Sequence, residues 1–159
     1  MQLTTHTDYA LRLLIFLAIR HPDTPATVQV AATRYGVSAH HMAKVVQTLV
    51  QHGYVISQRG RNGGLALARP AERINVGDVV RHTENLRLLE CFGPDSSCPI
   101  EPACNLKKLL GSAQEAFLTV LDECWLADLV TNRQQLRELL AAREPNEHNS
   151  YSSRKTSAN

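Results

Sequence analysis

Three of the four cysteines of this chain, Cys91, Cys98 and Cys104, lie in one short stretch, CFGPDSSCPIEPAC. Their C-x6-C-x5-C spacing is wider than that of the closely paired cysteines of zinc ribbons. Soft thiolates on an irregular loop favour an iron–sulfur cluster, copper(I) or zinc. The sequence therefore predicts a loop that holds a metal or a cluster. Free thiols and a redox disulfide are the alternatives.

A cubane cluster would need a fourth ligand, which the residues do not identify. Cys124 has the right chemistry, but it continues an apolar helical repeat and is better interpreted as a small buried hydrophobic side chain. We expect the fourth ligand to come from elsewhere, including a dimer partner. Asp8 opens a predicted helix, where an acidic side chain complements the helix dipole, and its position alone does not mark it as a ligand.

The segment between Thr24 and Ala71 contains no Asp or Glu. It carries a local charge of +5, whereas the rest of the chain has 12 Lys and Arg against 15 Asp and Glu. The basic residues of the segment are Arg34, Lys44, Arg59, Arg61 and Arg69. A positive module on a slightly acidic body is the pattern of a phosphate-binding surface.

This segment has the element order of a winged helix-turn-helix. Helices are predicted at 5–20, 28–35 and 39–52, and two short β-prone runs around a Gly-rich basic tip predict a hairpin at 54–68. The last of these helices would enter the major groove, and the hairpin would contact the DNA backbone or the minor groove.

Capping signals mark the ends of these helices. We expect Thr5 or Thr7 to cap the first, Thr27 the second and Ser38 the third. Gly53 is expected to end the third helix.

The third predicted helix has an apolar face and a polar face. The residues that share the apolar face are Met42, Val45, Val46 and Leu49. The polar face and the hairpin tip supply the residues that we expect to contact DNA, which are Ser38, His40, His41, Lys44, Arg59, Arg61 and Asn62.

The C-terminal half combines a short helix at 74–84, capped by Asn75, with the cysteine stretch and a heptad-patterned helix. Apolar residues recur there at alternating spacings of four and three, namely Leu106, Leu110, Ala113, Phe117, Val120 and Cys124. Others widen the stripe, namely Leu109, Ala116 and Leu121. Such a coiled-coil seam predicts self-association, and packing of the helix on its own domain is the alternative. A last amphipathic helix is predicted over 127–142.

These patterns predict a mainly α fold with a small β-wing, in which a winged helix-turn-helix domain is joined to a long dimerisation helix. We expect a DNA-binding domain at 1–85, the cluster-binding loop and dimerisation helices at 86–142, and a disordered polar tail at 143–159. The early apolar run 11–19 contains Arg12 and is too short to span a membrane. With no visible signal peptide, we expect a cytoplasmic protein without a membrane partner.

Over about residues 1–142 the sequence resembles the winged-helix iron–sulfur transcriptional regulators, and among them the nitric-oxide-sensitive members. The opening MQLTTHTDYALRLLIFLA, the wing RGRNGGLALA, the helix INVGDVVRHTE and the segment PACNLKKLLGSAQEAFL carry the resemblance. The order Cys91, Cys98, Cys104 matches the three cysteine ligands of that family.

The resemblance implies a homodimer with one 4Fe-4S cluster per subunit, whose fourth ligand is an aspartate supplied by the other subunit. Asp8 occupies that position. Family members that regulate iron–sulfur assembly use a histidine three residues beyond the third cysteine, and here that residue is Lys107. The implied function is a repressor that senses nitric oxide through its cluster, releases a palindromic operator in double-stranded DNA and so derepresses nitrosative-stress genes.

Three other interpretations remain. The same fold with a 2Fe-2S cluster would report iron or redox status, and a zinc- or disulfide-stabilised DNA-binding module would carry no signal. A thiol-based enzyme or electron carrier would have no use for an acid-free helix-turn-helix. The sequence contains no G-x-S-x-G, P-loop or dinucleotide fingerprint, and we expect a protein that is not an enzyme.

Overall fold

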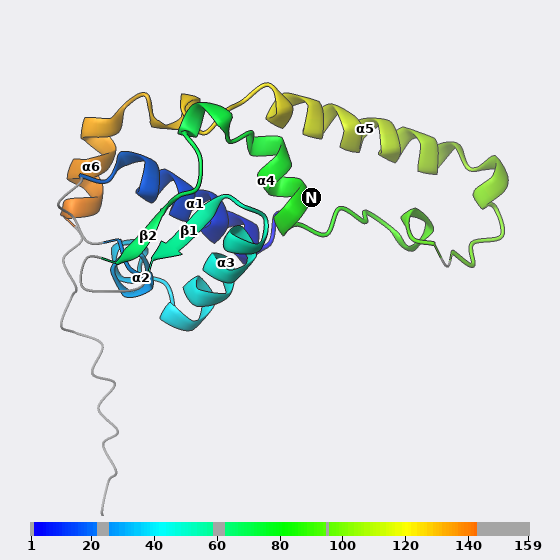
Figure 1. Ribbon diagram of the computed structural model, residues 1–159. Coiled ribbons are helices and arrows are strands. Elements are labelled where there is room, and N and C mark those ends of the chain that lie inside the picture. The colour runs from blue at the N-terminus through cyan, green and yellow to red at the C-terminus, as the bar shows by residue number, and fades with distance from the viewer. Residues whose placement is uncertain (1, 22–25, 59–62, 95, 143–159) are drawn as a thin grey trace, which may run out of the picture.

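The N-terminal elements assemble around helix α1 (Thr5–Ile19), as the computed structural model of residues 2–21, 26–58, 63–94 and 96–142 shows (Figure 1). Helices α2 (Val28–Tyr35) and α3 (Ala39–Gln51) form the helix-turn-helix, and strands β1 (Val55–Gln58) and β2 (Gly64–Leu67) form the antiparallel hairpin. The predicted fold class, mainly helical with a small wing, is confirmed.

The core lies between α1 and α3, where the apolar stripes of the two helices face each other. The buried residues of this interface are Leu13, Leu14, Leu17, Met42, Val45 and Leu49. Each such side chain contributes about 1.5–3 kcal/mol when it leaves water. This core fixes the orientation of α3, and its polar face therefore points outward, as predicted.

The predicted helix ends are partly confirmed. Thr27 accepts a hydrogen bond from Val30 N at 3.2 Å, and Gly53, in the left-handed conformation at φ 69°, follows the end of α3. The expected cap of α1 was wrong, because the N-cap is Thr4 rather than Thr5 or Thr7. Local sequence offers three threonines of equal chemistry, and the choice among them depends on a distant residue.

That residue is Glu84, which lies directly after helix α4 (Val76–Thr83). Its Oε2 accepts hydrogen bonds from Thr4 N at 2.8 Å, Thr4 Oγ1 at 3.0 Å and Thr7 Oγ1 at 2.8 Å. Burial acts to raise the pKa of Glu84, but these hydrogen bonds outweigh it and hold the pKa below its ordinary value. The carboxylate thus caps α1 from outside and joins its first turn to the end of α4.

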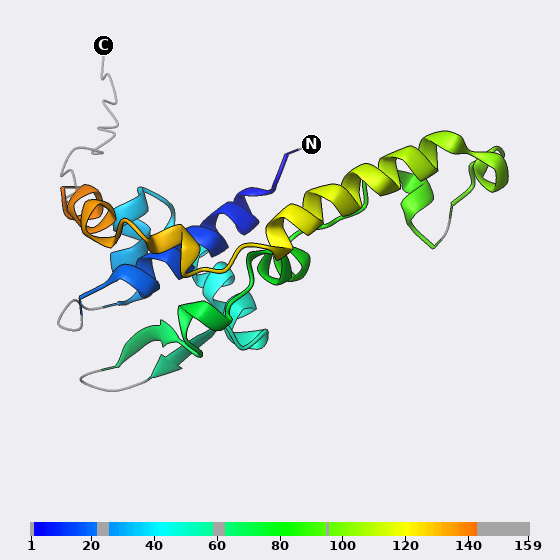
Figure 2. The ribbon, with the colours of Figure 1, turned by 90° about the horizontal axis from the view of Figure 1, so that it is seen from above.

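Helix α4 also fixes the long helix α5 (Asn105–Asp122) to the body. Arg81 makes a two-point ion pair with Asp122 at 2.5 and 2.7 Å, and Asn75 Nδ2 donates to the Asp122 carbonyl at 2.7 Å. Asn75 is also the N-cap of α4, as predicted, and accepts from Asp78 N at 3.1 Å. Only the C-terminal end of α5 is held in this way, and its N-terminal half projects away from the body (Figures 1 and 2).

The chain after α5 differs from the prediction in two places. Because α5 ends at Asp122, Cys124 lies beyond the helix and is not a seam residue. The single helix expected at 127–142 is a short turn, Asp128–Val130, followed by α6 (Arg133–Ala141), which packs on α1 and α2. The expected tail at 143–159 lies outside the described residues. None of the helices that are described could span a membrane.

Replacing Glu84 with Gln should lower the free energy of unfolding by about 1 kcal/mol, because the amide is a weaker acceptor for the three donors of α1. Since the folded-state pKa of Glu84 is lowered, its contribution is complete above the ordinary glutamate pKa. It is lost as the pH falls through the folded-state value. Urea unfolding of both proteins between pH 7 and pH 3 should therefore give converging curves. Glu72→Gln, at an exposed site, is the matched control, and equal midpoints for Glu84→Gln and wild type at pH 7 would contradict the cap.

Candidate metal centre and nucleic-acid interface

The cysteine loop, residues 85–104, runs back along α5 in the opposite direction to the helix (Figures 1 and 2). At its beginning, Gln114 Nε2 donates to the Leu86 carbonyl. Farther along, the Phe92 ring covers Gly111, where an added Cβ would lie 3.8 Å from the ring. The loop is therefore held against one face of α5.

Lys107 lies among the groups at the far end of this loop. Its Nζ donates to Glu101 Oε1 at 2.5 Å and lies 5.9 Å from the centre of the Phe92 ring. The hydrogen bond to Glu101 raises the pKa of Lys107, and negative charge on the Glu101 carboxylate and on the Cys91 and Cys104 sulfurs adds to the effect. A protonated amine has no lone pair and cannot bind a metal. Lys107 can instead balance the negative charge of thiolates beside it.

The three cysteines differ in their surroundings. Cys91 is half-buried in the turn Glu90–Phe92, and Cys98 is exposed. Cys104 is the N-cap of α5, and its Sγ accepts from Lys107 N at 3.3 Å. All are free thiols in the described chain, as is Cys124, whose pKa burial raises. The loop thus presents three thiols, two of which share Lys107 as a neighbour.

Within a single chain the predicted ligands are not assembled. The described residues include no group of three His, Cys, Asp or Glu side chains placed to hold a metal ion. Asp8 lies in the first turn of α1, where its Oδ1 accepts from Arg12 Nε at 2.7 Å and its side chain is 43% exposed. An exposed ion pair of this kind contributes about 0–1 kcal/mol, and the carboxylate can leave it at little cost.

Helix α5 presents three separate faces. The face toward its own chain holds Lys107, Gly111, Gln114 and Leu118, of which Leu118 is buried. The seam face holds Leu106, Leu109 and Val120, which are 57%, 67% and 67% exposed. The third face is polar and holds Lys108, Ser112, Glu115 and Thr119. Two other predicted seam residues, Leu110 and Phe117, are half-buried in the single chain, so the seam packs on its own chain in part and leaves an exposed strip for self-association.

The outward half of α3 gathers the predicted groove contacts. His40, His41 and Lys44 are exposed, with the two imidazole rings 6.1 Å apart. Ser38 occupies the N-cap position, but its side chain makes no capping hydrogen bond. Ser38 is exposed at the N-terminal end of α3, shortly before His40 and His41 in the chain.

The hairpin is the second part of the predicted DNA-binding surface. The hairpin packs beside α3 (Figure 1). The predicted tip residues Arg59, Arg61 and Asn62 lie outside the described residues.

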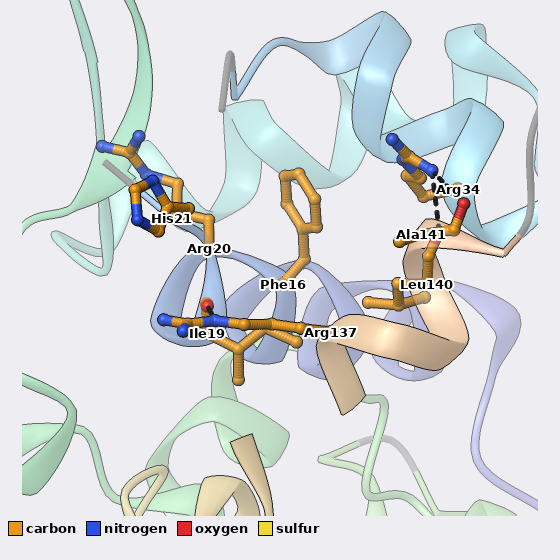
Figure 3. A pocket seen from close by; sticks show the side chains of 8 residues that line it. All are labelled: Phe16, Ile19, Arg20, His21, Arg34, Arg137, Leu140 and Ala141. Carbon is orange, nitrogen blue, oxygen red and sulfur yellow. Dashed lines mark hydrogen bonds between the residues drawn. The ribbon is translucent and has the colours of Figure 1, made fainter. Parts of the chain in front are cut away.

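A pocket of about 160 Å³ lies between the end of α1, α2 and α6 (Figure 3). Arg34 donates to the carbonyls of Leu140 and Ala141 at 2.9 and 3.0 Å, and Arg137 Nε donates to the Ile19 carbonyl. Basic side chains near a helix C-terminus can bond its last carbonyls, and both arginines do so here. The pocket marks where α6 is attached to the body.

Sequence reasoning missed the roles of Glu84, Glu101 and Lys107. Glu84 caps a helix whose first turn lies 77 and 80 residues earlier in the chain, and no local pattern marks such a residue. For Lys107, the signal was present as a basic residue in the first turn of a helix that begins at Cys104.

The chain is similar to known transcriptional regulators. The Rrf2 family, described as iron-dependent transcriptional regulators, matches residues 3–132. The HTH-type transcriptional regulator NsrR of Bacillus licheniformis is 43% identical over 143 residues, which cover 89% of this chain and all of that protein. NsrR of Bacillus subtilis is 44% identical over 146 residues, covering 91% of this chain and again all of the relative.

Solved structures share the fold. IscR of T. potens superposes with a TM-score of 0.67 at 26% identity, covering 86% of this chain and 91% of that one. CymR of B. subtilis, the global cysteine regulator, gives 0.66 at 28% identity, covering 83% and 98%. The predicted resemblance and a role as a transcriptional regulator rather than an enzyme are confirmed. With its helix-turn-helix, cysteine loop and projecting helix, the chain belongs to the Rrf2 family of iron-dependent transcriptional regulators.

Proposed function

We propose that this chain is a homodimeric repressor that binds a palindromic operator, and that nitric oxide releases the DNA by acting on an iron–sulfur cluster. The observation that carries the proposal is the position of the cysteine loop. It begins beside the first turn of α1, where Glu84 binds Thr4 and Thr7, and it follows the helix that bears the exposed seam. The relatives named NsrR support the signal.

The residues present fit a cluster with three thiolate ligands and one other. Cys91, Cys98 and Cys104 would bind three irons of a 4Fe-4S cluster, one per subunit, and the partner subunit's Asp8 would bind the fourth. Free thiols on one loop are the soft ligands that iron–sulfur clusters require. A bound cluster supplies an iron whose carboxylate ligand exchanges more readily than a thiolate, leaving it open to a small diatomic molecule.

If the partner's Asp8 binds a cluster that is held by the loop, the first turn of one α1 is connected to the other protomer. That turn belongs to the helix whose stripe packs on Met42, Val45 and Leu49 of α3. Its position therefore affects the spacing of the two α3 helices, which half-sites on a palindrome require. A coupling of about 3 kcal/mol changes affinity more than a hundredfold.

The direct experiment is anaerobic titration of the purified protein with nitric oxide while cluster absorbance and operator binding are followed together. We expect a brown protein with four irons and four sulfides per chain, and loss of absorbance and DNA binding together. A spectrum of the 2Fe-2S type would favour the iron- or redox-sensing alternative. Full operator binding after the cluster is destroyed would contradict the proposed switch.

Complementation tests whether Asp8 crosses the dimer. Neither Asp8→Ala nor Cys104→Ser homodimers should keep a stable cluster through gel filtration. A mixed dimer of the two variants should keep one, because the Asp8→Ala chain retains its cysteines and receives Asp8 from its partner. No gain in iron over the two homodimers would show that Asp8 is not supplied in trans.

The seam face of α5 predicts the dimer interface. Leu109→Glu should weaken the dimer at least a hundredfold, because a charge buried in an apolar seam costs about 3 kcal/mol or more. Sedimentation at several concentrations measures the effect. Ser112→Glu, on the polar face of the same helix, is the control and should remain dimeric. Equal dimerisation of both variants would show that the seam face is not the dimer interface.

Lys44 is proposed to neutralise a phosphate from the exposed side of α3. Lys44→Ala should weaken binding to operator and random DNA by similar factors and lower the slope of log affinity against log salt by about one. Arg59→Ala and Arg61→Ala should act alike, whereas Lys108→Ala on the polar face of α5 should not. A loss confined to one operator position would instead assign Lys44 to base recognition.

A further inference from the structure

Three aromatic rings meet at the end of α3, two from the connection between α3 and β1 and one from α4. His52 directly follows α3, Tyr54 precedes β1 and is buried, and His82 lies in the last turn of α4. The His52 and His82 rings are 4.3 Å apart between centroids and inclined by 31°. The Tyr54 hydroxyl lies 2.8 Å from His82 Nδ1. Helix α4 therefore reaches the end of α3 through a ring stack and a directional hydrogen bond.

Tyr54 connects these rings to the two predicted DNA-binding elements, helix α3 and the wing. Tyr54 N donates to the Leu49 carbonyl of α3 at 2.9 Å, and the Tyr54 carbonyl accepts from Ala68 N, just after β2, at 2.9 Å. The Arg69 guanidinium lies 4.7 Å from the centre of the Tyr54 ring. His82 is therefore connected through Tyr54 to the end of α3 and to the base of the wing.

On the other side, His82 stands two residues before Glu84 and four before Leu86, at the beginning of the cysteine loop. Glu84 binds the first turn of α1, and the Leu86 carbonyl accepts from Gln114 of α5. The beginning of the loop is therefore attached to α1 and to α5 within four residues of His82.

We propose that His82 is a positioning residue that transmits the state of the cysteine loop to α3 and the wing, through its stack on His52 and its hydrogen bond to Tyr54. This inference rests on the proposed function, because it concerns how the same switch reaches the DNA. His82 is exposed and His52 half-buried. A stack at the surface can separate and reform without unfolding a core, as a two-position contact requires.

The test compares operator affinity of cluster-loaded and cluster-free protein in wild type, His82→Asn and His52→Ala. Asn keeps a side-chain oxygen near Tyr54 but removes the ring, and His52→Ala removes the same stack from the other side. If the wild-type ratio of affinities is about a hundredfold, we expect it to fall below tenfold in both variants. Cluster absorbance and the thermal unfolding midpoint should stay at wild-type values. Arg73→Ala, an exposed site just before α4, is the control and should keep the wild-type ratio.

Hydrogen exchange gives a readout that does not depend on DNA. In wild type, the amides of Leu49, His52 and Tyr54 should exchange at different rates with and without the cluster, and this difference should vanish in both variants. Folded variants with the wild-type ratio and the wild-type exchange difference would overturn the role of His82. If His82→Asn does not fold, His52→Ala alone decides in the same way.

Different results would overturn the proposed function and the role of His82. A wild-type protein that binds its operator equally with and without the cluster overturns the proposed function and the role of His82 with it. A wild-type protein with strong cluster dependence, alongside variants that keep it, overturns only the role of His82.

Discussion

The division of helix α5 into separate faces is the constraint on which the cysteine loop and the proposed dimer interface both depend. With 3.6 residues per turn, a helix can offer one narrow face to each neighbour. Gly111 and Gln114 turn toward the cysteine loop, Leu109 and Val120 remain exposed, and Ser112 and Glu115 face water. The loop and a second protomer can therefore occupy α5 together without competing for the same side chains.

The attachment of α5 to the body is concentrated at its C-terminal end. At Gly77 of α4 a side chain would collide with the Asp122 carboxylate, which occupies that space and binds Arg81. The N-terminal half of α5 and the loop that precedes it project away from the body on this attachment (Figure 1). After α5, helix α6 packs on α1 and α2. The elements before and after the long helix therefore belong to the same body.

Two ion pairs of the single chain lie at or near the predicted ligands. The Asp8–Arg12 pair is exposed and easily parted, and Lys107 is held by Glu101 beside two thiols. Under the proposed function, Asp8 can therefore leave Arg12 at little cost and reach the other subunit. Helix α4 remains the element between loop and DNA, since its last turn contacts α1 through Glu84 and the end of α3 through His82.

The sequence by itself determined the elements whose signals are local. The 3.6-residue periodicity of α1 and α3, the capping chemistry of Thr27 and Asn75 and the glycine after α3 act within a few residues of one another. The cysteine spacing predicts soft metal ligands on the loop, but within one chain the described residues include no group of three His, Cys, Asp or Glu side chains that could hold a metal ion. Only the tertiary structure decided that Thr4 caps α1, that α5 ends before Cys124 and that His82 stacks on His52. These outcomes depend on contacts between residues far apart in the chain, whose energies exceed local preferences and leave no local pattern.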